Sequence, residues 1–248
     1  MNISVCLATY NGEKFIIEQL SSIIRQLDAN DEIIIVDDCS TDRTIEAIQS
    51  VNDSRIKIYF NHINKGHVFS FGRAISLTTK DYIFMSDQDD IWIDDRLQIM
   101  LDRMLSSNVL LLSSNTNYIN SDGNKIDFSE NKLKPKRSNK YLSNIIDILL
   151  GKGYYYGCAM AFKKEFKKII LPIPEYVESH DLWIALAANI YKSNLHLNES
   201  TLNRRVHGAN ASIVKRKIIP KLFSRLIFIK SIIELYQRKQ NRKKSNEK

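Results

Sequence analysis

Short apolar runs alternate with amphipathic stretches along the first hundred residues. Four of the apolar runs have the length of β-strands: residues 3–8, 32–36, 56–60 and 82–85. The three intervals between them carry apolar residues at helical spacing: residues 15–27, 41–50 and 68–77. The run at 32–36 is unbroken and aliphatic, which is typical of a strand buried on both faces. This alternation predicts a mostly parallel sheet flanked by helices, and therefore an α/β fold.

After the fourth run the pattern becomes less regular. It predicts, in chain order, a helix, a strand, a hairpin turn and a mobile basic loop: residues 94–106, 109–112, 122–123 and 129–140. A helix, a strand, a further helix and a basic terminal helix are expected to follow: residues 141–150, 155–162, 181–188 and 215–248. We therefore expect one domain over residues 1–214, with a mixed C-terminal region and an appended tail.

The composition is that of a folded soluble protein. The 248 residues are 44% hydrophobic and 26% charged, which excludes a chain that is disordered throughout. No stretch reaches the roughly 18 consecutive apolar residues that a membrane-spanning helix needs, and the N-terminus lacks the basic region that opens a secretory signal. These features favour a cytoplasmic protein.

The three cysteines, Cys6, Cys39 and Cys158, are widely spaced and form no CxxC pair. An odd number of separated thiols is typical of a reduced compartment, so we expect them to be unpaired. Cys39 and Cys158 are interpreted as small buried residues rather than nucleophiles, because no catalytic base accompanies either in the local sequence.

The positive charge is concentrated at the C-terminus. Residues 215–248 contain twelve Lys or Arg against two Glu, a net charge of +10, whereas residues 1–214 carry −2. The nearly neutral body makes nucleic acid an improbable partner. The tail also carries one apolar stripe at alternating spacings of three and four: Ile219, Leu222, Leu226, Ile229, Ile233 and Tyr236. Two interpretations stay open: peripheral contact with an anionic membrane, and a helix docked on the body or on a second subunit.

Polar residues follow all four predicted parallel strands. The strand ends read Thr9-Tyr10-Asn11-Gly12, Asp37-Asp38, Asn64-Lys65-Gly66 and Ser86-Asp87-Gln88-Asp89-Asp90. Each alone is explained by a turn, a helix cap or a solvated charge cluster. Together they meet at one edge of the sheet, where ligands of parallel sheets bind. Five carboxylates converging there would repel unless a cation or a donor-rich ligand shares the site.

The spacing of Asp87 and Asp89 points to a hard divalent cation. Two carboxylates at i and i+2 on a turn can face the same ion, and oxygen ligands suit Mg²⁺ or Mn²⁺. No His or Cys cluster has the spacing of a zinc site. Such a cation would neutralise the charge that develops on a diphosphate leaving group.

These motifs resemble those of the family 2 glycosyltransferases, and most of all their bacterial rhamnosyltransferase-like branch. The resemblance covers roughly residues 3–212 and rests on the strand ends above and on four later motifs: Ser86-Asp87-Gln88-Asp89-Asp90-Ile91-Trp92, Gly157-Cys158-Ala159-Met160-Ala161-Phe162, His180-Asp181-Leu182-Trp183 and His207-Gly208-Ala209-Asn210. It implies a GT-A fold with a nucleotide-sugar half over residues 1–107 and an acceptor half over residues 108–214. It also implies an inverting transfer of one sugar from a nucleotide diphosphate to an acceptor hydroxyl.

The resemblance assigns roles to individual residues. The donor-binding residues are Thr9, Tyr10, Asn11, Asp38, Lys65, Gly66 and Asp87. Asp87, Asp89 and His207 form the implied metal site, although a histidine in a His-Gly turn is more often structural. Asp181 is the implied general base. Single displacement needs one base opposite the leaving group, which agrees with that role, but an acidic residue in the first turn of a helix is also favoured by the helix dipole.

The same resemblance suggests donor, acceptor and place. The rhamnosyltransferase-like branch suggests a dTDP-linked sugar as the first choice of donor, with L-rhamnose as the sugar. A UDP-linked hexose is the second choice. The acceptor would be a growing, lipid-linked surface polysaccharide at the inner face of the cytoplasmic membrane. Two departures from the family pattern, at Ser114-Asn115 and at Arg204-Arg205, concern the acceptor side.

Three other functions were weighed. A receiver-type signalling domain needs a phosphorylatable Asp after the third strand, where this chain has Asn61, and it is about half as long. A sugar nucleotidyltransferase needs a Gly-rich basic loop after the first strand, which Thr9-Tyr10-Asn11-Gly12-Glu13 does not provide. A catalytically inactive GT-A scaffold stays open, and the intact Asp87, Asp89 and Asp181 argue against it.

Overall fold

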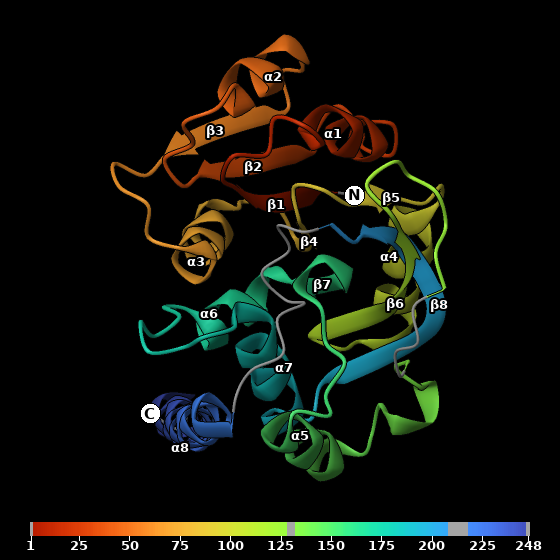
Figure 1. Ribbon diagram of the computed structural model, residues 1–248. Helices are drawn as coiled ribbons and strands as arrows, with labels where there is room; N and C mark the ends of the chain where they lie inside the picture. Colours follow the sequence, from red (N-terminus) through yellow and green to blue (C-terminus); the bar gives the residue numbers. More distant parts are fainter. Residues whose placement is uncertain (1, 128–131, 208–217, 247–248) are drawn as a thin grey trace.

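One mixed sheet of eight strands organises the chain in the computed structural model, which describes residues 2–127, 132–207 and 218–246 (Figure 1). The strand order is β3-β2-β1-β4-β7-β6-β8-β5. The strands are β1 (Ile3–Thr9), β2 (Glu32–Asp37), β3 (Ile56–Phe60), β4 (Tyr82–Ser86), β5 (Ile91–Trp92), β6 (Leu111–Ile119), β7 (Met160–Lys163) and β8 (Asn194–Arg205).

The first four long strands confirm the predicted α/β half. β3, β2, β1 and β4 are parallel neighbours. The helices that connect or follow them are α1 (Ile16–Ile24), α2 (Thr44–Ser50), α3 (His67–Leu77) and α4 (Arg96–Ser107). α2 begins three residues later than expected, because Asp42 accepts a hydrogen bond from the amide of Thr44 and so forms a turn before the helix.

The other half of the sheet is mixed, as expected, but two of its strands were not predicted. β7 is antiparallel to β4 and β6, β8 is parallel to β6, and the short β5 is antiparallel to β8. β8 escaped prediction because its apolar alternation is limited to Leu195 and Leu197 and is followed by a mostly polar run. Its polar side chains instead pair inside the sheet, where the hydroxyls of Ser114 and Thr201 lie 2.6 Å apart. β6 likewise continues beyond residue 112 through buried polar positions.

The basic segment after β6 differs from the expectation of a mobile loop. Residues 128–131 lie outside the described residues, but residues 132–140 pack on the body and contain a 3-10 turn, Pro135–Arg137. Leu133 and Ser138 are buried, and the Ser138 hydroxyl accepts a hydrogen bond of 2.9 Å from the amide of His196. The predicted hairpin turn at 122–123 is present, since the amide of Gly123 donates to the carbonyl of Asn120.

Two hydrophobic cores cover the two faces of the sheet. Alternate residues of β2 point to opposite sides, so that Ile33 and Ile35 join the core beneath α1 and α4. Ile34 and Val36 join the core beneath α3, α5 (Tyr141–Leu150) and α7 (His180–Ile190). This double burial explains the unbroken aliphatic run.

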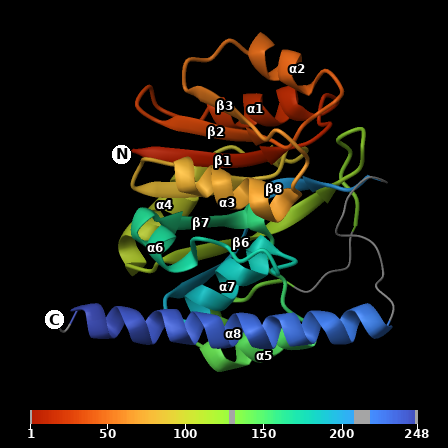
Figure 2. The same ribbon diagram turned by 90° about the vertical axis from the view of Figure 1, so that its left-hand side faces the viewer.

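The long terminal helix α8 (Ile218–Asn246) lies along α7, with α5 and the short α6 (Lys167–Ile170) beside it (Figure 2). Phe228 and Leu235 are buried against the body. Within the described residues, no helix is both long enough and apolar enough to span a bilayer. The three cysteines are free, but Cys39 is only half-buried, so the expectation of a buried residue was wrong there. Cys39 adopts a left-handed backbone conformation, with φ 69°, in the turn after β2.

Candidate active site

The carboxyl ends of the parallel strands bring the predicted polar residues to one edge of the sheet. Thr9 is paired with Asp37 across β1 and β2, and Leu7 with Ser86 across β1 and β4. The turn that begins at Asp87 therefore starts beside the β1 end. The site consists of this turn, the loops after β1 and β2, and segments contributed by β7, α7 and β8.

Gln88 connects the turn of residues 87–90, which we call the acidic turn, to the loop after β1 through hydrogen bonds. Its Oε1 accepts hydrogen bonds from the Thr9 hydroxyl at 2.7 Å and from the Tyr10 amide at 2.9 Å, and its Nε2 donates to the Tyr10 carbonyl at 3.1 Å. A Cβ on Gly12 would lie 2.5 Å from Gln88 Oε1, so the glycine leaves room for the Gln88 amide to approach this closely. Sequence reasoning missed Gln88, although its place between two predicted metal carboxylates was a signal.

Asn11 joins the loops after β1 and β2. Its amide donates to the Ser40 hydroxyl at 2.9 Å, and its Oδ1 accepts from the Thr41 amide at 2.8 Å. Asn11 adopts a left-handed conformation, with φ 48°, which asparagine tolerates better than most residues. Tyr10 beside it is exposed. The strand-end residues thus form a rigid rim with one aromatic side chain facing solvent.

Asp38, Lys65 and Gly66 lie together, as the strand-end argument predicts. The Asp38 carboxylate accepts hydrogen bonds from the amide of Lys65 at 2.8 Å, the amide of Gly66 at 2.7 Å and Nδ2 of Asn61 at 2.7 Å. Gly66 has φ 82°, a conformation that favours glycine. Asp38 therefore closes the loop after β3 onto the end of β2.

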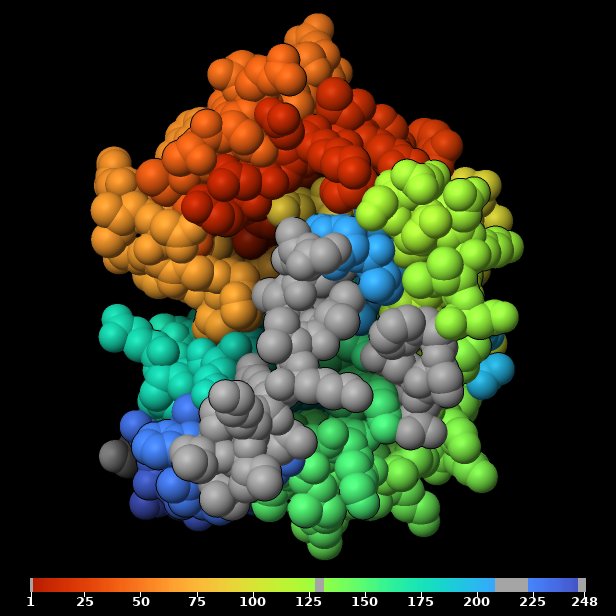
Figure 3. Space-filling model, viewed as in Figure 1, coloured from red at the N-terminus to blue at the C-terminus, as the bar shows by residue number. Residues whose placement is uncertain are grey.

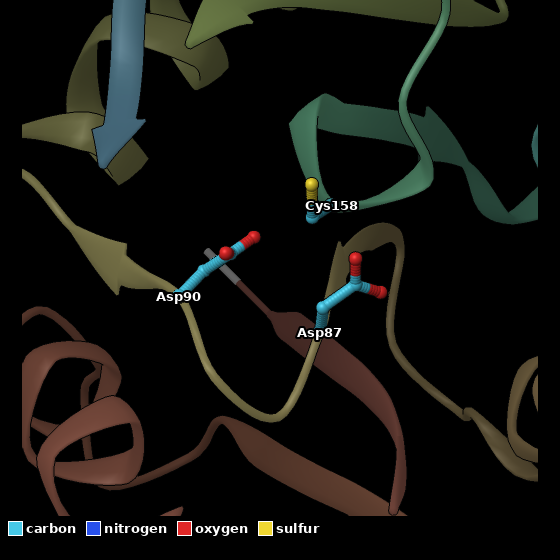
Figure 4. Close-up of side chains that lie close together, drawn as sticks. All are labelled: Asp87, Asp90 and Cys158. Atoms are coloured by element: carbon cyan, nitrogen blue, oxygen red, sulfur yellow. The ribbon is translucent and has the colours of Figure 1, made fainter. Parts of the chain in front are cut away.

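Asp87 and Asp90 form an acidic cluster with the Cys158 thiol (Figure 4). The nearest ligand atoms of the three residues lie within 4.8 Å of one another. Burial and the neighbouring carboxylates of Asp90 and Asp89 raise the pKa of Asp87 well above its usual range. Burial and Asp89 also raise the pKa of Asp90 to about 7. A buried carboxyl and a half-buried one, both with raised pKa values, are typical of a place where a cation or a donor-rich ligand binds.

Asp89 and His207 form a second pair beside this cluster. His207 Nε2 lies 2.7 Å from Asp89 Oδ2, and the two side chains are 18% and 15% exposed. The ring of Phe15 packs on the imidazole, with 5.2 Å between ring centroids. The structure thus pairs Asp89 and His207 of the implied metal site, whereas the third predicted residue, Asp87, groups with Asp90 and Cys158. Gly208 and Asn210 of the same motif lie outside the described residues.

Two adjacent arginines complete the surroundings of the acidic turn. The guanidinium of Arg204 lies 4.2 Å from the ring centroid of Tyr156. Burial would lower the Arg204 pKa, but Cys158, Tyr156 and Asp87 outweigh it, so the pKa is raised. Arg205 is buried and donates from Nε to the Asp89 carbonyl at 2.9 Å and from its amide to Asp90 Oδ1 at 3.0 Å. Arg204 therefore contributes positive charge to the site. Arg205 holds the turn that carries Asp89 and Asp90 in place through its hydrogen bonds.

The donor atoms of the site fit a divalent cation. The carboxylate oxygens suit Mg²⁺ or Mn²⁺, and the imidazole nitrogen fits Mn²⁺ better than Mg²⁺, which prefers oxygen ligands. Asp90 Oδ2 is buried and has no hydrogen-bond partner within the part of the chain that the structure describes, as expected of an atom that lacks a ligand. Asp90 and Cys158 were not predicted as site residues. Both residues stand in motifs that carry the family resemblance, but nothing local to Cys158 places it beside a carboxylate, since its position depends on β7.

Asp181 lies in the first turn of α7. Ser179 caps this helix by accepting from the Leu182 amide, and Asp181 Oδ1 accepts from the same amide at 3.0 Å and from the Ser179 hydroxyl. A Cβ on Gly157 would lie 2.8 Å from His180 Nε2 and 3.5 Å from Asp181 Cβ. Gly157 therefore permits the close approach of α7 to the segment that carries Cys158, and Asp181 lies near enough to raise the pKa of Asp87.

A cavity of about 260 Å³ opens beside Tyr156. Its lining is polar and aromatic and includes Thr116, Asn117, Tyr154 and Tyr156. Tyr156 thus lines this cavity and also contacts Arg204 of the site. Amide, hydroxyl and aromatic groups are the usual means of binding a polyhydroxylated ligand.

Comparison with known proteins agrees with this geometry. A protein-family model described as Glycosyl transferase family 2 matches residues 4–170. The chain is similar to the Escherichia coli UDP-Glc:alpha-D-GlcNAc-diphosphoundecaprenol beta-1,3-glucosyltransferase WfgD, with 34% identity over 107 residues, 43% of this chain and 42% of the relative. It is also similar to the dTDP-rhamnosyl transferase RfbG of Shigella flexneri, with 44% identity over 110 residues, 41% of this chain and 38% of the relative. The matches thus span about two fifths of these relatives.

Solved structures extend the likeness to the whole fold. The S. aureus TarS 1-349 structure in complex with UDP-GlcNAc aligns with a TM-score of 0.69 and 17% identity, over 96% of this chain and 72% of that chain. The mannosyltransferase PcManGT from Pyrobaculum calidifontis, in complex with GDP-Man and Mn2+, aligns with a TM-score of 0.62 and 16% identity, over 95% of this chain and 73% of that chain. These likenesses confirm the predicted GT-A type of α/β fold.

Proposed function

This chain belongs to glycosyl transferase family 2, and on that premise we propose that it transfers one sugar from a nucleoside diphosphate donor to a hydroxyl of a saccharide acceptor, with inversion at the anomeric carbon. The observation that carries the proposal is that the Asp89–His207 pair and the Asp87–Asp90 carboxyls both lie at the carboxyl edge of the parallel sheet, with Asp181 of α7 near Asp87. Such an edge is where parallel sheets bind nucleotides.

The proposed chemistry is a single displacement. Asp181 removes the proton of the acceptor hydroxyl, the acceptor oxygen forms a bond to the anomeric carbon, and the bond from that carbon to the diphosphate oxygen breaks. The nucleoside diphosphate leaves with the bonding electrons. One carboxylate is enough for this chemistry, because no covalent sugar intermediate is formed.

A divalent cation, Mn²⁺ or Mg²⁺, fits the leaving-group side of the site. Asp89 and His207 would hold it, with Asp87 beside them, and the bound cation would neutralise charge on the departing diphosphate. Arg204 supplies a fixed positive charge near the same carboxylates. Arg205 holds the backbone of Asp89 in place.

The donor is proposed to be a dTDP-linked sugar, with L-rhamnose first, or a UDP-linked hexose second. Support comes from relatives whose names specify a dTDP-rhamnosyl transferase and a UDP-Glc glucosyltransferase. The rim is proposed to bind the nucleotide through Thr9, Tyr10, Asn11, Asp38, Lys65 and Gly66. Tyr10, which is 45% exposed, offers an aromatic face to a base.

The acceptor is proposed to be a lipid-linked saccharide of a growing surface polysaccharide. WfgD, by its name, acts on a diphosphoundecaprenol-linked sugar. The cavity beside Tyr156 is the place proposed for the saccharide, since it lies next to the segment that approaches Asp181. Peripheral contact through the C-terminal tail would bring the chain to such an acceptor at the inner face of the cytoplasmic membrane.

The experiment is a donor screen of the purified chain. It is incubated with dTDP-L-rhamnose, UDP-glucose, UDP-GlcNAc and GDP-mannose, each with Mn²⁺, and with a GlcNAc-diphosphate-lipid acceptor, and the nucleoside diphosphate released is measured. Release from the dTDP or UDP donors, absent in Asp181→Asn, supports the proposal. Release from GDP-mannose alone contradicts the donor assignment. A parallel assay supplies a nucleoside triphosphate and a sugar 1-phosphate, and release of pyrophosphate there would instead indicate a nucleotidyltransferase.

A further inference from the structure

Exposed apolar side chains concentrate on two neighbouring helices. Among the residues that the structure describes, fourteen large hydrophobic side chains are exposed, and eight of them belong to α5 and α8. On α5 they are Leu142, Ile146 and Leu150, and on α8 they are Phe223, Leu226, Ile229, Ile233 and Tyr236. The two helices form the lower end of the molecule in the views of Figures 1 and 3. Concentration on one face points to an interaction surface.

The body does not bury the apolar stripe of α8, because another face of the helix makes the docking contacts. Phe228 and Leu235 fill the interface. Around them, the Tyr176 hydroxyl donates to Glu234 at 2.6 Å and Lys239 Nζ donates to the Ile190 carbonyl at 2.6 Å. Of the stripe that the sequence predicts, Leu226, Ile229, Ile233 and Tyr236 are instead exposed, and the side chains of Ile219 and Leu222 lie outside the described residues.

α5 presents a stripe of its own. Leu142, Ile146 and Leu150 follow each other at intervals of four and so form one line along the helix, with exposures of 70%, 45% and 51%. The helix is held by buried residues on another face, Ile145 and Ile148. The end of α5 touches α8, where Arg225 Nη2 donates to the Leu150 carbonyl at 2.8 Å.

The net charge of α8 indicates which kind of partner the exposed apolar surface binds. The helix carries eight basic residues against one acidic residue, Glu234. Four of the eight also contact the body: Arg225, Lys230, Arg238 and Lys239. The other four are Lys221, Arg242, Lys243 and Lys244. Glu234 is engaged by Arg238 at 2.7 Å. A second copy of the chain would place two such helices against each other, and their like charges would repel. An anionic lipid surface complements both the basic charge and the apolar stripe.

We infer that α5 and α8 together form a membrane-binding surface that rests on an anionic bilayer through the two apolar stripes. The surface is a preformed part of the folded body and is wider than the C-terminal tail alone. The inference deepens the proposed function by fixing how the chain would meet a lipid-linked acceptor, and it rests on that function only for the identity of the acceptor.

The test is flotation of the full chain with vesicles of phosphatidylcholine, alone or with 30% phosphatidylglycerol, a composition of roughly the charge that anionic membranes present. We expect the wild type to bind the anionic vesicles, and to bind less at high salt. Leu142→Gln/Ile146→Gln on α5 and Leu226→Gln/Ile233→Gln on α8 should each lower the bound fraction by about tenfold or more. The matched control is Ile63→Gln, an exposed apolar residue on neither helix.

Each variant is also checked for its melting temperature and its sedimentation coefficient. A wild type that does not bind anionic vesicles overturns the inference, and so does an α5 variant that binds as the wild type does. A wild-type dimer that both double variants dissociate would identify a second copy as the occupant and also overturn it. Vesicle binding requires no sugar donor, so a chain that binds vesicles but transfers no sugar would contradict the proposed function and leave the surface intact.

Discussion

The Nε2 of His207 lies 2.7 Å from the Oδ2 of Asp89, although 118 residues separate them along the chain. Asp89 follows the parallel strand β4, and His207 follows β8. The two meet because β5 pairs with β8 in antiparallel fashion, with Ile91 opposite Asn203. The C-terminal half of the sheet thereby completes a site that the N-terminal half begins.

This pair predicts metal-dependent transfer. Asp89→Ala should lower kcat by several orders of magnitude, because the bound cation contributes several kcal/mol of charge stabilisation to the leaving diphosphate. EDTA should abolish transfer by the wild type, and Mn²⁺ or Mg²⁺ should restore it. Release of nucleoside diphosphate is the measurement. Asp102→Ala, at an exposed position of α4, is the control. Full activity of Asp89→Ala in the presence of chelator would show that this carboxylate holds no cation.

Asp181→Asn should separate binding from turnover. An asparagine Oδ1 can still accept the hydrogen bond from the Leu182 amide, so the first turn of α7 should keep its structure. Removing a general base costs about 10²- to 10⁴-fold in kcat while ground-state binding is retained. We expect normal calorimetric binding of the nucleoside diphosphate and slow transfer. Weak nucleotide binding with normal turnover would instead assign Asp181 to the donor site.

Arg205 should matter more for stability than its surface neighbours do. Its side chain is 2% exposed, and it bonds the carbonyls of Asp89 and Ser121 and the carboxylate of Glu18. Arg205→Met would leave buried carbonyls without donors, so we expect a loss of about 2–4 kcal/mol in the free energy of unfolding. Arg103→Met removes only an exposed ion pair of 3.5 Å and should cost less than about 1 kcal/mol. Urea unfolding compares the two, and equal losses would contradict a bracing role for Arg205.

The parallel half of the fold could be predicted because each element there carries its own local signal. The run at β2 is aliphatic throughout, since both of its faces are buried. Asp38, Lys65 and Gly66 could be expected near one another because parallel strands end at one edge. Their hydrogen bonds in the structure agree with that geometry.

The rest depends on contacts that no local pattern encodes. The second half of β8 is stabilised by cross-strand polar pairs such as Asn117 with Asn203, at 3.2 Å, so apolar alternation marks only its first residues, Leu195 and Leu197. Asp90 and Cys158 meet only because β7 inserts antiparallel between β4 and β6. The stripe of α8 was visible in the sequence, but which face docks is decided by the surface of α7.

Stability should fall between pH 6.5 and 4 because of buried histidines. His196 is 2% exposed, and burial, aided by Arg137, lowers its pKa to about 4. Burial also lowers the pKa of His180 to about 4. Below pH 6.5 the unfolded chain takes up protons that the folded chain does not, so each histidine contributes a slope of up to about 1.4 kcal/mol per pH unit. This contribution is complete above pH 6.5 and is lost as the pH falls toward 4.

Urea unfolding at pH 7, 6 and 5 measures the slope. His196→Gln should lower stability at pH 7, since it disturbs the 2.8 Å bond to the Tyr155 hydroxyl, but it should also flatten the slope. His62→Gln, at an exposed position, should leave the slope as it is. A wild-type slope that His196→Gln does not change would mean that the imidazole of His196 titrates alike in the folded and unfolded chains.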